Sequence, residues 1–105
     1  SGNSFVHETE SQVILNGSYN INFTMDLVLK DTGLFDDLAK KLDAPLEISP
    51  KVVEIFKDGQ KKYGSRAWSS MIVKRMEDLN KIDFRAEGFP EELVDNEPEE
   101  KGHEI

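Results

Sequence analysis

Two adjacent charged residues, Lys30 and Asp31, lie in the middle of the most apolar helical segment of the sequence. At about 100° per residue, a helix over this segment places Lys30 in a stripe of apolar side chains. The members of that stripe are Phe23, Leu27, Leu34 and Leu38. A charge among apolar side chains is costly unless it is paired or faces a polar cleft. Two interpretations follow: Lys30 faces a bound ligand, or it reaches to water while Asp31 makes a local ion pair.

The composition narrows the class of protein. A chain of 105 residues is predicted to form one domain with a modest core. The absence of cysteine excludes a disulfide scaffold, a thiolate metal site and a cysteine nucleophile. A net charge of −8 opposes binding to nucleic acid or to an anionic membrane. With no apolar run long enough to span a bilayer and no signal peptide, we expect a soluble, cytoplasmic protein.

The order of apolar residues and capping signals predicts an all-α fold, a small bundle of three or four helices. Residues 1–20 are expected to form an arm or short helix that ends at Asn16-Gly17, a pair typical of a left-handed cap. Residues 21–80 are expected to be the helical core, with helices at about 21–42, 50–63 and 65–80. Residues 81–105 form an acidic tail.

Capping residues set these expected boundaries. The predicted helix starts are capped by Asn20, by Ser49 before Pro50, and by Ser65, and Gly64 is the predicted stop of the middle helix. Gly33, inside the first long helix, costs up to about 1 kcal/mol relative to alanine. A close approach by a neighbouring element would account for it.

The acidic tail is typical of a solvated segment without chemistry of its own. From Glu87 onward it holds eight acidic side chains and a single lysine, Lys101. Its apolar residues at Phe84, Phe89-Pro90 and Leu93-Val94 are candidate anchors of an otherwise extended strap.

Several kinds of chemistry are not predicted. His7 and His103 lie at opposite ends of the sequence, which argues against a histidine metal site. The sequence contains none of the glycine-rich motifs that bind nucleotides. Adjacent carboxylates such as Asp36 and Asp37 do not face each other on a helix and give no acid/base pair.

One order of features is nevertheless recognisable over about residues 17–80. It consists of Phe23, Lys30-Asp31, Ala44-Pro45-Leu46, Gly64 and Trp68-Ser69-Ser70. This order resembles the C-terminal helical domain of the β-hydroxyacid dehydrogenases, the 3-hydroxyisobutyrate dehydrogenase-like family within the 6-phosphogluconate dehydrogenase superfamily. The resemblance implies the 6-phosphogluconate dehydrogenase C-terminal domain-like fold. The sequence departs from the family pattern at Ala67, where members often have aspartate, so capping of the last helix falls to Ser65 or to no side chain.

The resemblance also implies roles for three residues. In this family a Rossmann domain binds NAD or NADP, and the helical domain closes over cofactor and substrate, a 3-hydroxy acid or the corresponding aldehyde or keto acid. It also supplies the contacts of a homo-oligomer. By matching position, Lys30 would contact the cofactor near its nicotinamide end. Asp31 would hold Lys30 or a substrate-facing network, and Phe23 would form a wall of the reacting pocket.

The family's catalytic machinery has no counterpart in this sequence. Its general acid is a lysine in a Gly-x-x-x-Lys-x-x-Asn-Asn segment, and neither that segment nor the Rossmann glycine loop is present. The resemblance therefore implies a fragment of an NAD(P)-dependent oxidoreductase that contains no catalytic residue, binds no cofactor alone and is inactive alone. The alternative is a stand-alone helical protein-interaction module without catalysis.

Overall fold

The computed structural model describes residues 1–94 and 98–102, and over this part of the chain the fold is entirely helical. The elements are α1 (Phe5–Asn16), α2 (Met25–Lys41), α3 (Ser49–Tyr63), the short 3₁₀ helix η1 (Ser69–Val73) and α4 (Lys74–Asn80). Among these residues the one extended backbone pairing found is an isolated antiparallel bridge between Thr24 and Trp68. The all-α prediction is confirmed. No helix in the described ranges is both long enough and apolar enough to cross a bilayer.

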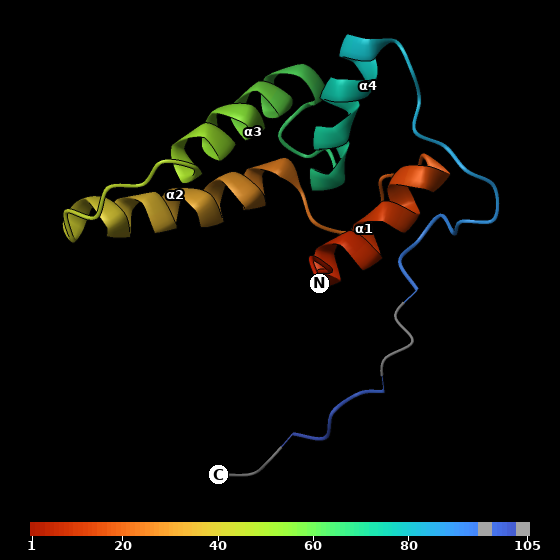
Figure 1. Ribbon diagram of the computed structural model, residues 1–105, viewed down its shortest axis with the longest axis horizontal. Helices are drawn as coiled ribbons and strands as arrows, with labels where there is room; N and C mark the ends of the chain where they lie inside the picture. The colour runs from red at the N-terminus through yellow and green to blue at the C-terminus, as the bar shows by residue number, and fades with distance from the viewer. Residues whose placement is uncertain (95–97, 103–105) are drawn as a thin grey trace.

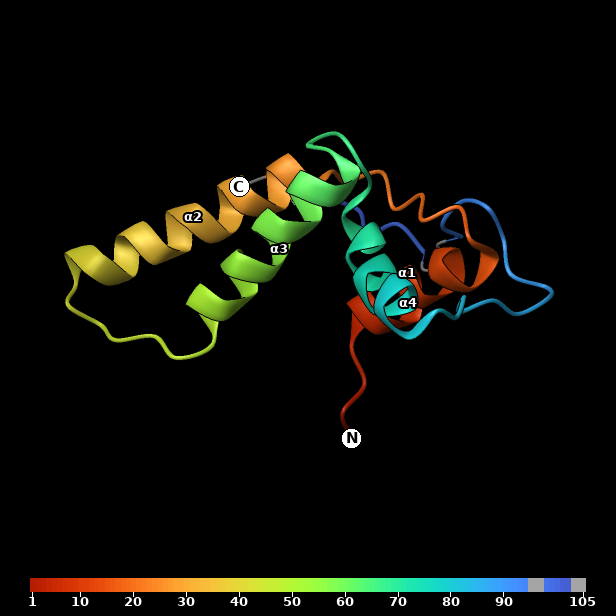
Figure 2. The same cartoon turned by 90° about the horizontal axis from the view of Figure 1, so that it is seen from above.

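The helices form two groups. α2 and α3 pack side by side as a helical hairpin, and α1, η1 and α4 gather at the open end of that hairpin (Figure 1). Seen from above, the loop that joins α2 to α3 lies at the far end, away from α1 and α4 (Figure 2). The most deeply buried apolar side chains are Val13 of α1 and Met25 at the start of α2. The core is therefore centred where the two groups meet.

The first long helix starts at Met25, not at about residue 21 as the apolar pattern predicts. Asn20 does not cap it, and neither does the side chain of Thr24, which precedes it. The first amide groups are satisfied by a distant segment instead, because the carbonyl of Ala67 accepts from Met25 N–H (2.9 Å) and that of Ser65 accepts from Asp26 N–H (3.0 Å). Four N–H groups at a helix start lack intrahelical partners, so these long-range bonds decide where α2 begins.

The predicted caps of the next two helices also need correction. α3 begins at Ser49 itself, whose hydroxyl donates to Asp36 Oδ1 (2.7 Å) on α2 rather than capping its own helix. The predicted last helix does not start at Ser65, because the carbonyls of Ser65 and Ala67 accept hydrogen bonds from the first amide groups of α2. The chain turns helical at Ser69, first as η1, whose start has no side-chain cap.

Two glycine-ended helices agree with the sequence. Gly17, at φ 93°, ends α1, and its N–H bonds to the carbonyls of Val13 and Ile14, which confirms the left-handed cap. Gly64, at φ 103°, follows the last residue of α3 as predicted.

Gly33, where a close approach by a neighbouring element would account for a helical glycine, has no such neighbour within the described structure. A Cβ built on Gly33 would meet no atom within 4 Å, whereas one on Gly59 in α3 would lie 2.8 Å from Ile72 Cδ1. The close approach that a helical glycine permits therefore occurs at Gly59, where α3 packs on η1.

Candidate functional site at the exposed face of α2

Lys30 and Asp31 form an ion pair on the surface of α2. Lys30 Nζ lies 2.9 Å from Asp31 Oδ1, and the two side chains are 60% and 55% exposed. This is the geometry of the second interpretation from the sequence, a local pair that reaches to water. An ammonium group has three N–H donors, so this pair leaves Lys30 able to bond further acceptors.

The apolar stripe around Lys30 is exposed as well. Two of its helical members, Leu34 and Leu38, are more than half accessible, and so are Phe35 and Leu42 beside them, whereas Leu27 is half-buried. Contiguous apolar surface of this kind usually marks a contact with another protein surface or a ligand. α2 therefore presents a charged pair within an uncovered apolar face.

Phe23 does not lie on that stripe, because α2 begins two residues after it. It is half-buried, and its carbonyl accepts a 2.7 Å hydrogen bond from Ser69 N–H. The structure thus joins Phe23 to the segment that opens η1 and separates it from Lys30 by the first turn of α2. The helical-stripe prediction holds for Leu27, Leu34 and Leu38 but not for Phe23.

The start of α2 carries an electrostatic cluster that the sequence pattern did not reveal. The Asp26 carboxylate accepts from the Thr24 hydroxyl, from Leu27 N–H (3.0 Å) and from Arg66 Nη1 (3.1 Å). The Thr24 hydrogen bond, followed by that of Arg66, lowers the pKa of Asp26 in spite of partial desolvation. A carboxylate in the first turn also complements the helix dipole. Arg66 comes from the loop after α3, so only the folded chain brings these groups together.

A cavity of about 540 Å³ lies beside the N-terminal end of α2. It is lined by Asn20, Ile21, Asn22, Trp68, Glu92 and Leu93. Asn22 adopts a left-handed backbone with φ 57°, which is uncommon outside glycine but more tolerated by asparagine. The tail residues in this lining could not be placed from sequence, although Leu93 was one of the predicted anchors.

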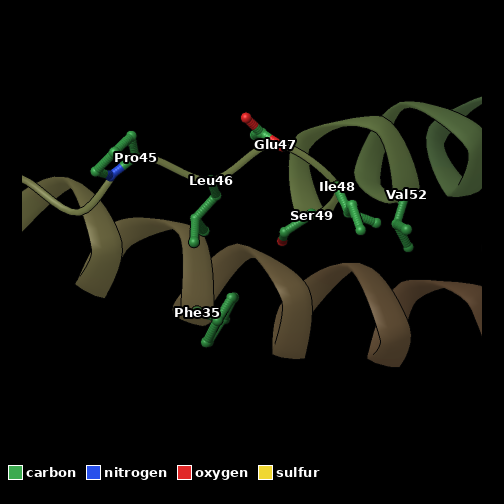
Figure 3. A pocket seen from close by; sticks show the side chains of 7 residues that line it. All are labelled: Phe35, Pro45, Leu46, Glu47, Ile48, Ser49 and Val52. Atoms are coloured by element: carbon green, nitrogen blue, oxygen red, sulfur yellow. The ribbon is translucent and has the colours of Figure 1, made fainter.

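A second cavity, of about 670 Å³, lies at the other end of the hairpin. Its lining is mostly apolar and comes from α2, the connecting segment and the first turn of α3: Phe35, Pro45, Leu46, Glu47, Ile48, Ser49 and Val52. Figure 3 shows Leu46 directed from the connecting segment toward α2. This second cavity adjoins the exposed face of α2, because Phe35 belongs to both.

Metal ligands do not gather within the described ranges. No three histidine, aspartate or glutamate side chains come together there as a ligand set. His103, one of the two histidines considered from sequence, lies outside the described residues.

Comparison with protein families gives a match over residues 1–76 to the family described as NAD-binding of NADP-dependent 3-hydroxyisobutyrate dehydrogenase. The match contains Phe23, Lys30 and Asp31, and it extends over α1, beyond the resemblance that starts near residue 17. Neither the curated proteins nor the solved structures gave a significant match. Because the family match spans well over half of the 105 residues, the chain belongs to the 3-hydroxyisobutyrate dehydrogenase-like NAD-binding family, within the β-hydroxyacid dehydrogenases.

Proposed function

We propose that this chain is the C-terminal, substrate-closing and dimerising domain of an NAD(P)-dependent β-hydroxyacid dehydrogenase or reductase, and that it acts when joined to a Rossmann domain. The observation that carries the proposal is the exposed Lys30–Asp31 pair within an uncovered apolar face, inside the region of the family match. A surface of this composition is suited to closing over a ligand held by another domain.

The residues fit a nicotinamide cofactor in their donor chemistry. Lys30 offers N–H donors and a positive charge, and the neighbouring apolar side chains would exclude water once covered, which strengthens each polar contact. The nicotinamide, when bound, supplies the hydride acceptor or donor for the 3-hydroxy acid. Lys30 would orient that end of the cofactor, Asp31 would hold the Lys30 ammonium, and Phe23 would form a wall of the pocket that the two domains enclose. Their contribution is positioning.

Proton transfer in this proposal belongs to the other domain. The lysine that acts as general acid in the family is not among these residues, so the chain alone is expected to be inactive. The substrate class is a 3-hydroxy acid or the corresponding aldehyde or keto acid.

Steady-state kinetics of the protein joined to its cofactor domain would test the role of Lys30. Lys30→Ala is expected to raise KM for cofactor or substrate while the circular dichroism spectrum and the unfolding midpoint stay unchanged. Lys40→Ala is the matched control, because Lys40 is an exposed lysine near the C-terminal end of the same helix. Wild-type kinetics for Lys30→Ala would remove Lys30 from the site.

A stand-alone interaction module is the second candidate, favoured by the apolar groove around Phe35 and Leu46. The coding sequence upstream of Ser1 distinguishes the two. A glycine-rich nucleotide loop and a Gly-x-x-x-Lys-x-x-Asn-Asn segment there would support the dehydrogenase, whereas a start codon immediately before Ser1 would support the module.

A further inference from the structure

Glu77 of α4 is a buried carboxylate with one nearby cation among the described residues. Its side chain is almost fully inaccessible, at 1% of the residue exposed. Arg85 Nη1 lies 3.3 Å from Oε2 and 3.4 Å from Oε1. The Tyr19 hydroxyl donates to Oε1 at 2.5 Å. The cluster thus joins three segments that are distant in sequence.

The positive charge of Arg85 compensates the negative charge of the buried Glu77 carboxylate. Burial acts to raise the pKa of Glu77, but the hydrogen bond from Tyr19 and the charge of Arg85 outweigh it, so the net pKa is lowered. The carboxylate is therefore ionised at neutral pH. Removing one member of a buried ion pair leaves an uncompensated charge in the interior, which is strongly unfavourable.

Arg85 is also held by Tyr19. Its Nη2 donates to the Tyr19 hydroxyl at 2.7 Å, and the guanidinium carbon lies 5.1 Å from the centre of the Tyr19 ring, a cation–π distance. Tyr19 has a left-handed backbone at φ 55°, and its carbonyl accepts from the Ser70 hydroxyl at 2.6 Å. A left-handed backbone at a bulky residue is uncommon and persists only where surrounding contacts hold it, and the Ser70 hydrogen bond is one such contact.

The same arginine covers the C-terminal end of α1. Its Nη1 donates to the carbonyl of Ile14 at 3.2 Å, and Ala86 N–H donates to that of Leu15 at 3.0 Å. The last carbonyls of a helix lack intrahelical donors and favour a positive charge. α1 has no basic residue in its own last turn. Arg85 and Ala86 of the tail thus supply the hydrogen-bond donors and the positive charge that the C-terminal end of α1 lacks.

Two further hydrogen bonds attach the tail to the C-terminal end of α1 and the residues that follow it. The Asn16 amide donates to the carbonyl of Phe89 at 2.9 Å, and the Ser18 hydroxyl donates to that of Glu91 at 2.5 Å. Glu92 and Leu93 then form one wall of the cavity beside Trp68. The ribbon views show this segment running from α4 around the end of α1 (Figures 1 and 2).

We propose that residues 84–93 form a docked strap that closes the cavity beside Trp68, and that Arg85 is the residue that holds it there. An acidic segment of this kind is normally solvated. The strap docks because its arginine, Arg85, pairs with the buried carboxylate of Glu77. The strap follows Met76, where the family match ends, and it is independent of the dehydrogenase proposal. Release of the strap opens the cavity to ligand or solvent.

Trp68 makes the strap directly measurable, because it is the only tryptophan of the chain and shares the cavity with Leu93. Arg85→Ala is expected to shift the emission of Trp68 to the red and to increase its quenching by acrylamide. It should also speed cleavage by a glutamate-specific protease at Glu87 and Glu91. Lys101→Ala is the control for loss of a tail cation and should leave all three readouts unchanged.

Truncated chains test whether residues 84–93 themselves are responsible for the change in Trp68 emission. A chain ending at Asp83 should reproduce the Trp68 shift of Arg85→Ala, whereas a chain ending at Val94 should match the wild type. Should Arg85→Ala fail to fold, Glu77→Gln in the same chain removes the uncompensated charge and restores the fold, with Trp68 still exposed. Wild-type emission in both Arg85→Ala and the Asp83 truncation would overturn the proposal, as would an equal shift in the Val94 truncation.

Discussion

Gly59 of α3 lies so close to Ile72 of η1 that a Cβ on the glycine would be 2.8 Å from Ile72 Cδ1. The fully buried Met25 lies on the same side, with Cε 3.3 Å from that Cβ position. An added methyl group at Gly59 would require Ile72 or Met25 to shift, because protein interiors are densely packed.

Substitution of the two helical glycines is expected to have opposite effects. Gly33→Ala should stabilise the isolated chain by up to about 1 kcal/mol, since alanine favours helix and the site is open. Gly59→Ala gains the same helix preference but overpacks the contact with Ile72, which costs about 1–3 kcal/mol. Urea unfolding would compare the two variants. Equal free energies of unfolding would show that the Ile72 contact is not restrictive.

A second glycine pair tests the docking of Arg85. Gly17 and Gly64 both have positive φ, at 93° and 103°, so alanine strains the backbone at either position. A Cβ on Gly17 would in addition lie 2.5 Å from Arg85 Nε, whereas one on Gly64 meets no atom within 4 Å. Gly17→Ala is therefore expected to speed cleavage at Glu87 by a glutamate-specific protease, and Gly64→Ala to leave that rate unchanged. The same cleavage rate in both variants would contradict the close approach of Arg85.

Acid sensitivity is expected to depend on Asp58. Its carboxylate lies 2.6 Å from Arg75 Nε of α4 and 3.1 Å from Lys62 Nζ, and the hydrogen bond from Arg75, followed by that from Lys62, lowers its pKa. A lowered pKa in the folded state contributes stability above the unfolded pKa of about 3.9, and that contribution is lost as pH falls through the folded value.

Asp58→Asn should therefore lower the free energy of unfolding at pH 7. It should also make that free energy less dependent on pH below about pH 4. Urea unfolding of both proteins at several pH values measures the effect. Glu54→Gln is a suitable control, because Glu54 lies on the same helix in an exposed pair with Lys51. An acid dependence of Asp58→Asn identical to that of the wild type would exclude Asp58 as a source of it.

The exposed face of α2 is expected to be buried in self-association. Leu38→Gln should weaken the proposed dimer, because it places an amide in an apolar contact. Leu79→Gln is the matched control on α4: Leu79 is 74% exposed and Leu38 is 54% exposed, and they lie in different helical groups. Light scattering over a range of concentrations reports the dissociation constant. Equal weakening by both variants, or none by Leu38→Gln, would place the contact elsewhere.

Local signals in the sequence were sufficient for much of this structure. The apolar periodicity predicted the helices, and the glycines at positions 17 and 64 predicted where two of them end. The order that includes Lys30-Asp31 led to the correct family. These features depend on residues a few positions apart, for which helical geometry alone determines what lies on a common face or at a terminus.

Contacts between distant segments decided the rest. The start of α2 depends on the carbonyls of Ser65 and Ala67, which accept from its first amide groups where no side chain caps the helix. The exposure of Lys30 depends on which elements pack against α2, and the docking of Arg85 depends on a carboxylate that becomes buried only when α4 meets Tyr19. Hydrogen bonding and desolvation at these sites arise from tertiary packing, and periodicity and capping patterns carry no record of them.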